Sequence, residues 1–530
     1  MGANSIKRAI NEFSKIVGSE NIIINPDLRS VSGEKRKIPA IIFPKDEEEV
    51  KNIVNVANEF KTPLYPVSTG KNWGLGSALP VEDGCIVVSL KNMKKIEEVN
   101  IKNAYAVIEP GVTQWYLYEH LKKNNIPLIM DVTGSGKDSS IIGNALERGV
   151  GYFGQRGEDI CGLKVVLGNG KVIETGFGHY PNSKTKYIYP YGIGPDLTGI
   201  FFQSNFGIVV KGGINLIPKS DEYVTFVTKI KNEKDLPEYI ERLKEIKKNG
   251  LVKGVVHIGN RERSKISISP LIFENLEKTY PQADKKYLRE LTEKLFDNEF
   301  YGDWSATGRI YGPKKHVAEA EKQIKKASKC LGSTMFLNDK FINYADKITN
   351  LFSFIPYVKK KQIILNASKP IYNFTKGIPN DAAIKSVYWP IMNPPDMLDP
   401  DNSKCGIIYY CPITPFDGNE VEKVISIIKQ IFNKYGFEPS ITLNTLDYKA
   451  LETVISIPFK RDEETTENAH KAIIELHKNL TSIGIYPYRA SIDLMEYITD
   501  PTDDFWQTVK AMKNVFDPNN IISPRRYNLI

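Results

Sequence analysis

The feature that most constrains this chain is a short stretch rich in glycine and hydroxyl side chains, residues 66–76, Pro-Val-Ser-Thr-Gly-Lys-Asn-Trp-Gly-Leu-Gly. It follows a helical pattern over residues 50–60 and a short apolar segment. Glycine lets the backbone turn and approach a ligand, and unpaired N–H groups in such a loop form a concave anion site. The stretch matches neither a Walker loop nor the Gly-x-Gly-x-x-Gly fingerprint. It therefore indicates either another kind of phosphate-binding turn or a tight surface turn.

Two further loops share this composition. Residues 133–145 read Thr-Gly-Ser-Gly-Lys-Asp-Ser-Ser-Ile-Ile-Gly-Asn-Ala and precede an apolar helix start, and glycines punctuate residues 191–211. Three such loops within about 150 residues suit a ligand with an extended pyrophosphate and a large ring system. The first loop is therefore better interpreted as part of a cofactor site than as an isolated turn.

The segments around these loops predict alternating short strands and helices. Strands are expected over 38–43, 85–89 and 104–109, a helix from the N-cap Thr113 through Leu121, and a hairpin around Asn169-Gly170. From about residue 222, longer helical patterns alternate with strand-like runs. The helices are expected over 234–249, 284–296, 314–329, 421–435 and 465–483, and the strands over 223–229, 251–258, 407–413, 440–446 and 454–458. The fold class predicted is α+β, in two large domains.

Bulk properties exclude several classes of protein. The net charge of +8 comes from scattered lysines, which favours solvated faces over a nucleic-acid site. The 5 cysteines form no Cys-x-x-Cys pair and the 6 histidines are dispersed, so neither a metal site nor a disulfide framework is expected. No apolar run is long enough to span a membrane, and no signal peptide is recognisable. We therefore expect a cytoplasmic protein without a nucleic-acid, membrane or metal partner.

Six stretches together resemble the vanillyl-alcohol oxidase and para-cresol methylhydroxylase (PCMH) family of flavoproteins. They are residues 66–76, 107–113, 142–152, 202–211, 488–489 and 517–524, of which Gly-Asn-Ala-Leu-Glu-Arg-Gly-Val-Gly-Tyr at 143–152 is the most specific. The resemblance runs almost from end to end and is weakest in the middle. It implies a two-lobed PCMH-type FAD-binding domain built from residues 1–222 and 486–530, with an α+β cap domain over 223–485.

The resemblance also implies the cofactor and the residues that hold it. The first two loops would cradle the pyrophosphate of FAD through backbone N–H groups, and residues 204–208 would line the flavin and ribityl chain. The cofactor-binding residues predicted in this way are Pro66, Ser68, Thr69, Gly70, Lys71, Asn72, Gly74, Leu75, Ser139, Ser140, Gly143, Asn144, Gly151, Asn205, Gly207 and Ile208.

The chemistry that the family implies is oxidation at the benzylic carbon of a para-substituted phenol. The phenol binds as phenolate, hydride passes to flavin N5, and a p-quinone methide remains, which adds water or loses a proton. Ionising a phenol near neutral pH requires its pKa to fall by several units from about 10, and cations and hydrogen-bond donors provide this. The residues matched to these tasks are Tyr488 and Arg489 for the phenolate, Arg526 near flavin and substrate, and Asp159 or Glu158 as acid/base. Each could instead be an ordinary structural residue: Tyr488 a core aromatic, the arginines surface or tail cations, and the two acids loop residues.

Three departures from the family pattern matter. Leu75 stands where the phenol oxidisers have a phenolate-contacting tyrosine, which removes a donor worth ~1–2 kcal/mol. Ile407 takes the position of the histidine that links FAD covalently, and no tyrosine stands near Asp399, so we predict non-covalent FAD. The only nearby tyrosines that could overturn this are Tyr388, Tyr409 and Tyr410. Leu451-Glu452 replaces the family's paired histidines.

Two other functions remain open at this point. The FAD enzyme could oxidise a 2-hydroxy acid or an aliphatic alcohol, with Arg489 and Arg526 holding a carboxylate; the loss of the tyrosine at Leu75 motivates this alternative. The chain could also be a flavin subunit that docks to an electron carrier such as a c-type cytochrome. The sequence does not distinguish O2 from a cytochrome as electron acceptor. The partners expected are a small aromatic substrate, such an acceptor, and a second copy in a homodimer.

Overall fold

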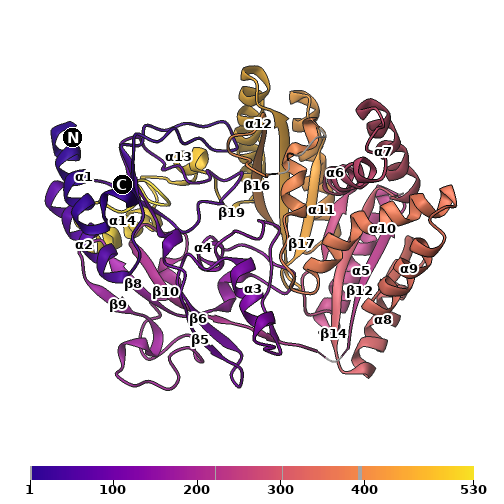
Figure 1. Ribbon diagram of the computed structural model, residues 1–530, viewed down its shortest axis with the longest axis horizontal. Helices are drawn as coiled ribbons and strands as arrows, with labels where there is room; N and C mark the ends of the chain where they lie inside the picture. The colour runs from indigo at the N-terminus through magenta and orange to yellow at the C-terminus, as the bar shows by residue number, and fades with distance from the viewer. Residues whose placement is uncertain (1–2, 221, 301, 392–394, 396) are drawn as a thin grey trace.

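The computed structural model describes residues 3–220, 222–300, 302–391, 395 and 397–530. Both chain ends lie together at one end of the molecule, and the middle of the chain forms the other end (Figure 1). The end with both termini contains a four-stranded and a five-stranded sheet, and the other end is built on an eight-stranded sheet. Helices and strands are thus mixed throughout, which confirms the α+β class.

The four-stranded sheet carries the first glycine loop. Its order is β1 (Ile22–Ile24), β2 (Ala40–Ile42), β4 (Ile86–Ser89) and β3 (Leu64–Val67), with β2, β4 and β3 parallel. Helices α1 (Ala3–Val17) and α2 (Glu47–Phe60) bury their apolar sides in the same core as this sheet. The loop therefore begins where β3 ends, at the carboxyl edge of a parallel sheet.

The returning C-terminus completes this sheet. Leu64 N–H donates to the carbonyl of Ile521, and Ser523 N–H donates to the carbonyl of Leu64. Lys513, in the last helix α14 (Asp504–Phe516), and Asp517 form a fully buried ion pair of 2.6 Å. Asp517 also accepts the N–H groups of Ile521 and Ile522. Because a buried ion pair is tolerated only with its hydrogen bonds satisfied, this pair fixes the C-terminal segment in one conformation.

The five-stranded sheet is antiparallel and lies beside the second loop. Its order is β5 (Ile96–Asn100), β6 (Tyr105–Ile108), β10 (Gly207–Asn215), β8 (Ile160–Leu167) and β9 (Val172–Glu174). The predicted hairpin around Asn169-Gly170 joins β8 to β9, with Gly170 at φ 80°. Helix α3 (Gln114–Lys123) begins as predicted at Thr113, whose hydroxyl accepts the N–H of Tyr116. A two-stranded sheet pairs β7 (Leu128–Ile129) with β11 (Ile217–Pro218).

The eight-stranded sheet forms the cap end of the molecule. Its order is β15 (Gly332–Leu337), β12 (Glu222–Ile230), β14 (Trp304–Gly312), β13 (His257–Asn260), β17 (Ser440–Thr445), β18 (Ala450–Lys460), β16 (Cys405–Pro415) and β19 (Pro487–Arg489). Four helices bury their apolar sides in its core: α5 (Leu236–Lys248), α8 (Lys314–Ser328), α11 (Gly418–Tyr435) and α12 (Glu463–Ser482). β19, which carries Tyr488 and Arg489, is an edge strand of this sheet.

A second set of helices shares a hydrophobic core with part of the five-stranded sheet. α6 (Arg261–Thr279), α7 (Lys285–Glu299) and α10 (Pro356–Phe374) share a core with β6, β8 and α3, and α9 (Asp339–Leu351) packs on α10. The remaining short helices are α4 (Ile141–Leu146) and α13 (Met495–Ile498). In the described part of the chain, no helix combines the length and apolarity needed to cross a bilayer.

One predicted strand was wrong in its extent. Over 251–258 the structure has strand only from His257, and the apolar Val252, Val255 and Val256 are buried in a loop instead. Val255 N–H donates to the carbonyl of Tyr152, and a Cβ at Gly254 would lie 2.9 Å from that oxygen. The segment is apolar because it packs against the loop at Tyr152, not because it continues the sheet.

Candidate functional site

A cavity of about 360 Å³ lies between the glycine loops and the cap sheet. Its walls come from the loop after β3, the loop before α4 and the start of β10 on one side, and from β16, β17, β18, β19 and the start of α6 on the other. Most of the predicted site residues line it: Pro66, Ser68, Thr69, Gly70, Lys71, Asn72, Leu75, Ser139, Ser140, Gly143, Asn144, Gly207, Ile208, Tyr488, Arg489 and Arg526. The structure thus brings together loops that are far apart in the sequence.

The first loop presents its backbone to the cavity. Within the described part of the chain, no hydrogen bond uses the backbone N–H groups of Ser68, Thr69, Gly70, Lys71 or Asn72. These residues are half-buried, and a run of unpaired backbone N–H groups in a glycine-rich loop forms a concavity that suits an anion. Thr69 also binds the second loop, since its hydroxyl accepts the N–H of Ser140 at 3.1 Å.

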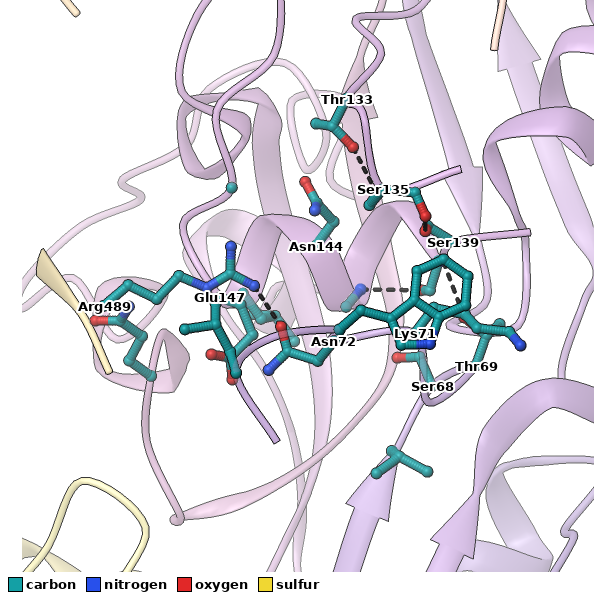
Figure 2. A pocket seen from close by; sticks show the side chains of 18 of the residues that line it. Ser68, Thr69, Lys71, Asn72, Thr133, Ser135, Ser139, Asn144, Glu147 and Arg489 are labelled. Carbon is teal, nitrogen blue, oxygen red and sulfur yellow. Dashed lines mark hydrogen bonds between the residues drawn. The ribbon is translucent and has the colours of Figure 1, made fainter. Parts of the chain in front are cut away.

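The second loop closes the same wall (Figure 2). Ser140 is the N-cap of α4: its hydroxyl accepts the N–H of Gly143 at 2.9 Å and donates to the carbonyl of Pro110. A Cβ at Gly143 would lie 2.8 Å from the Ser68 hydroxyl, so only glycine allows the two loops to approach this closely. Asn144 Oδ1 is buried and has no partner among the described residues. These loops fit the pyrophosphate of a dinucleotide.

Two arginines enter the cavity from the C-terminal part of the chain. Arg489 donates to Asn72 Oδ1 at 2.5 Å, so the phenolate candidate touches the glycine loop (Figure 2). Arg526 is buried and forms an ion pair of 2.6 Å with Glu147, besides donating to the Tyr65 hydroxyl. Burial alone would raise the pKa of the Glu147 carboxyl, but Arg526 and Arg489 outweigh it and hold this pKa below its usual value. Arg526 is therefore an interior residue and not part of a solvated tail.

Tyr488 begins a chain of polar side chains across the cap sheet. Its hydroxyl donates to Glu452 Oε1, Asn444 donates to Glu452 Oε2 at 2.8 Å, and His257 Nδ1 lies 2.6 Å from Asn444 Oδ1. The strand register produces this row, because Asn444 pairs with both Glu452 and His257. Burial raises the pKa of the Glu452 carboxyl, although Tyr488, Asn444 and Arg489 oppose it. Burial also lowers the pKa of His257 to about 4, so this imidazole is neutral at neutral pH.

Comparisons with known proteins agree with this geometry. A family model described as an FAD binding domain matches residues 38–176. The flavoprotein subunit of 4-cresol dehydrogenase (hydroxylating) from Pseudomonas putida is 26% identical over 98% of this chain and 95% of the relative. The structure of p-cresol methylhydroxylase with bound substrate superposes with a TM-score of 0.82 at 24% identity, covering 99% of this chain and 97% of the other. These findings support the PCMH family. The chain is an FAD-dependent oxidoreductase.

Other proteins similar to this chain have names that state different reactions. The 1'-carboxy-chondrochloren decarboxylase of Chondromyces crocatus is 29% identical over 100% of this chain and 98% of the relative. A 4-ethylphenol oxidase from Gulosibacter chungangensis superposes with a TM-score of 0.83 at 24% identity, covering 100% of this chain and 98% of the other. Both are similar to this chain over almost its whole length, while the reactions that they are named for differ.

Three predicted cofactor residues lie outside the cavity lining and position their neighbours. Gly74 has φ 74°, and a Cβ there would lie 2.2 Å from the Tyr409 ring. A Cβ at Gly151 would lie 2.1 Å from the Asp131 carboxylate. Asn205 donates to the carbonyls of Ser523 and Ile530 and so binds the C-terminal segment.

The structure does not bring the two predicted acid/base residues to the cavity. Glu158 and Asp159 lie in a short 3₁₀ helix, and neither lines the cavity. Asp159 forms an ion pair of 3.1 Å with the buried Arg156, which also donates to the carbonyl of Asp131. Burial raises the pKa of Asp159 to about 7. A catalytic role for either acid stays a prediction.

Glu452 is the acid that the sequence did not identify as functional. It was noted there only as the replacement for a pair of histidines. Its burial, its bond to Tyr488 and its place in the cavity lining depend on the pairing of β18 with β17 and on the edge strand β19, which lie far apart in the sequence. An acid inside an apolar strand pattern was the one available signal, since such residues are rarely buried without a partner.

The tyrosines that could carry a covalent flavin link differ in position. Tyr409 lines the cavity, whereas Tyr410 is in the core on the other face of the cap sheet, with its hydroxyl 3.2 Å from His477 Nδ1. Tyr388 is buried in a small apolar cluster together with Ile407. Non-covalent attachment of FAD therefore stays a prediction, with Tyr409 as the residue to examine first.

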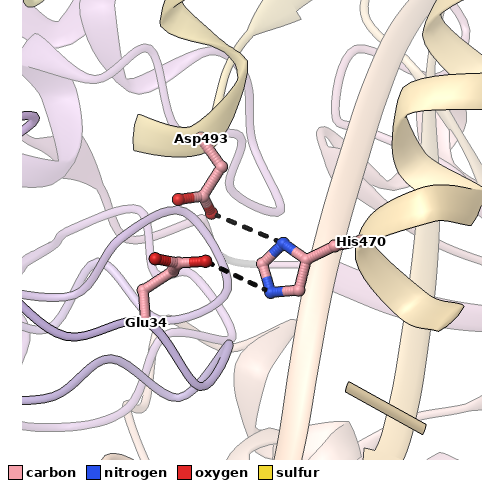
Figure 3. A group of neighbouring side chains, drawn as sticks. All are labelled: Glu34, His470 and Asp493. Atoms are coloured by element: carbon pink, nitrogen blue, oxygen red, sulfur yellow. Dashed lines mark ion pairs between the residues drawn. The ribbon is translucent and has the colours of Figure 1, made fainter. Parts of the chain in front are cut away.

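One group of side chains away from the cavity has the composition of a metal site. Glu34, His470 and Asp493 point their polar atoms toward one another (Figure 3). Arg36 forms ion pairs of 2.8 Å with Glu34 and 3.6 Å with Asp493, and His470 Nε2 lies 3.0 Å from the carbonyl of Ser32. Since Arg36 already supplies a positive charge to both carboxylates, we interpret this group as an ionic tie between α12 and the N-terminal segment.

Proposed function

We propose that this enzyme oxidises the benzylic carbon of a para-substituted phenol. The observation that carries the proposal is the Tyr488 hydroxyl, bound to the buried Glu452 beside the Arg489 guanidinium in the cavity wall. A phenol that binds here meets a cation, a hydroxyl and, through that hydroxyl, a base. This is the set of groups that ionising a phenol near neutral pH requires.

Phenol ionisation then follows a defined proton path. The phenol O–H donates to the Tyr488 oxygen while the Tyr488 O–H donates to Glu452, so a concerted shift delivers the proton to the carboxylate. Burial, which raises the Glu452 pKa, makes this carboxylate a better base than a solvated one. Arg489 stabilises the phenolate that remains, and each pKa unit of that stabilisation corresponds to about 1.4 kcal/mol. Leu75 contributes no donor, so Glu452 and Arg489 take over what the family's third tyrosine provides.

The residues of the two glycine loops hold FAD in this proposal. The free N–H groups of residues 68–72 bind the pyrophosphate. Residues 1–222 and 486–530 form the FAD domain, from which β19 adds an edge strand to the cap sheet, and residues 223–485 form the rest of the cap. Bound FAD supplies a two-electron acceptor for the benzylic hydride. The substrate is left as a p-quinone methide, to which water adds or from which a proton is lost. We further propose that FAD is held without a covalent bond, which acid precipitation tests because free FAD stays in the supernatant.

The alternative substrate class is a 2-hydroxy acid or an aliphatic alcohol. It requires Arg489 and Arg526 to hold a carboxylate together. Arg526 is already neutralised by Glu147 at 2.6 Å, which argues against this role. A buried arginine with a carboxylate partner gains little from a second one.

Anaerobic bleaching of the flavin tests the proposal directly. We expect 4-ethylphenol and 4-hydroxybenzyl alcohol to reduce the bound FAD, and lactate and glycolate to leave it oxidised. A spectrum that no phenol changes, or reduction by 2-hydroxy acids alone, would sink the proposal. Reoxidation by O2, compared with reoxidation by a c-type cytochrome, identifies the acceptor, and gel filtration tests the predicted homodimer.

A further inference from the structure

Arg263 lines the cavity from the cap side and has no acidic partner. It lies in the first turn of α6, where the side chain of Asn260 accepts its N–H at 2.9 Å. Its Nε donates to the Thr442 hydroxyl at 3.2 Å, and its Nη1 is buried without a hydrogen-bond partner in the described part of the chain. No ion pair of Arg263 occurs among the described residues.

The other cavity arginines are accounted for. Arg526 pairs with Glu147, and Arg489 donates to Asn72 and lies close enough to Glu147 to help lower that carboxyl's pKa. Among the arginines in the described lining of the cavity, Arg263 is therefore the one without an acidic neighbour. A partly buried charge without a partner is costly, and a ligand anion removes that cost.

The titratable side chains around Arg263 carry no negative charge that could neutralise it. Its charge acts on Tyr152, His257 and Tyr409. Burial raises the pKa of both tyrosines, and the Arg263 guanidinium partly lowers it again. For His257, burial lowers the pKa and the guanidinium lowers it further. His257 is neutral and the tyrosines are protonated, so none of the three supplies a negative charge. No hydrogen bond within the described part of the chain uses the Tyr409 hydroxyl, which is therefore available as a second donor.

The strand order separates Thr442, which Arg263 contacts, from Arg489 along the cap-side wall. Thr442 on β17 pairs with Val454 on β18, Cys411 on β16 pairs with Arg489 on β19, and β18 neighbours β16. Three strand spacings of about 4.8 Å separate the backbones of Thr442 and Arg489 by roughly 14 Å. The Tyr488 side chain crosses part of this interval, since its hydroxyl donates to Glu452 on β18. Val454 and Cys411 form an apolar floor between Thr442 and Arg489.

A cresol has no second anionic group for Arg263. Its side chain ends at the benzylic carbon, roughly 6 Å from its oxygen by ordinary bond lengths. A side chain that continues past this carbon and ends in a carboxylate supplies the anion that Arg263 lacks. We propose that Arg263, with Tyr409, forms a carboxylate subsite, and that the substrate is a 4-hydroxyphenyl compound whose side chain ends in a carboxylate. This inference rests on the proposed phenol oxidation and names the substrate class of the same site.

Binding to reduced holoenzyme tests the subsite without turnover. The flavin is reduced anaerobically with dithionite, and calorimetry gives dissociation constants for 3-(4-hydroxyphenyl)propanoate and for its amide. The enzyme forms compared are wild type, Arg263→Met, Arg263→Lys and the control Lys265→Met. Lys265 lies on the same helix and contacts the Trp389 ring, but it does not line the cavity. FAD content per chain is measured for every form.

The expected result is a preference of tenfold or more for the acid over its amide in wild type and in Lys265→Met. The preference falls to within twofold in Arg263→Met and is partly retained in Arg263→Lys. Equal binding of acid and amide by wild type, or loss of FAD in Arg263→Met, overturns the subsite, the second because the guanidinium would then serve the cofactor. If neutral phenols reduce the bound flavin but the acid binds no more tightly than its amide, only this inference fails. If no phenol reduces it, the proposed function fails and the subsite fails with it.

Discussion

The two walls of the cavity use different parts of the polypeptide. On the glycine-loop wall, residues 68–72 line the cavity with backbone N–H groups that have no partner in the described part of the chain, and side chains such as Thr69 hold the loops together. On the cap wall, side chains from separate strands do the work, as in the row from His257 through Asn444 and Glu452 to Tyr488. The first wall is local in sequence, and the second exists only after the sheet has formed.

This difference predicts opposite sensitivities to mutation. A backbone site tolerates changes of side chain but not an added Cβ at a close approach, such as Gly143 against Ser68. A site made of side chains tolerates substitutions at residues next to it in the sequence, but not the loss of one charged or donating side chain. FAD affinity should therefore respond to the first wall, and the rate of flavin reduction to the second.

The largest effect is expected for Glu452→Gln. The amide cannot accept the phenol proton, so we expect flavin reduction by 4-ethylphenol at pH 7 to slow by roughly 10²–10³-fold, the range of general base catalysis. FAD content should not change. In wild type the rate should rise with pH through the raised pKa of Glu452, because only the carboxylate accepts the proton. In the variant this rise should move toward the phenol's own pKa of about 10. Anaerobic stopped-flow measurements from pH 6 to 10 check both statements.

Tyr488→Phe is the companion to that experiment. If the proton passes through the Tyr488 hydroxyl, the two single substitutions should cost similar amounts and the double variant little more than either. Fully additive losses would show that the two residues act separately and would contradict the relay.

On the glycine-loop wall, Gly143→Ala should weaken FAD binding about tenfold or more. The new methyl group would meet the Ser68 hydroxyl at 2.8 Å and push the two loops apart, a strain of typically 1–3 kcal/mol. Flavin reduction by enzyme saturated with FAD should change little. Gly154→Ala is the matched control, since a Cβ there meets nothing within 4 Å. Equal loss of FAD in both variants would contradict the close-approach argument.

The same contrast explains what the sequence could predict. Residues 66–76 carry their own turn chemistry, so the loop, its hydroxyls and the helix N-cap at Thr113 were predictable from local pattern. Glu452 and Arg263 have no local signature, because their meaning comes from the register of β17, β18 and β13. The strand predicted over 251–258 was wrong for a related reason. The apolar residues of 252–256 pack on another part of the chain rather than continue a strand.

A smaller effect is expected where the two walls meet, at Leu75. This side chain is buried in the cavity lining, where the family has a phenolate-contacting tyrosine. Leu75→Tyr should tighten binding of 4-ethylphenol to reduced enzyme by about fivefold, corresponding to ~1 kcal/mol for one hydrogen bond. Leu75→Phe adds the ring without the hydroxyl and should give no gain. An equal gain of affinity in both variants would show that packing of the ring, and not the tyrosine hydroxyl, tightens binding.

The smallest effect on turnover is expected for Asp159→Asn. Asp159 pairs with Arg156 outside the cavity lining, so flavin reduction at pH 7 should stay within about twofold of wild type. A loss of a hundredfold would instead make Asp159 the acid/base of the reaction.

Its effect on stability should depend on pH. The folded-state pKa of Asp159 is about 7, because burial raises it above the ordinary carboxyl value of 3.8. Its contribution to stability is then complete below pH 4 and is lost as pH rises through 7. Thermal midpoints at pH 5 and pH 8 should therefore differ less in Asp159→Asn than in wild type. A difference as large as that of wild type would show that Asp159 is already ionised in the folded enzyme at pH 5, and that Arg156 outweighs burial at this position.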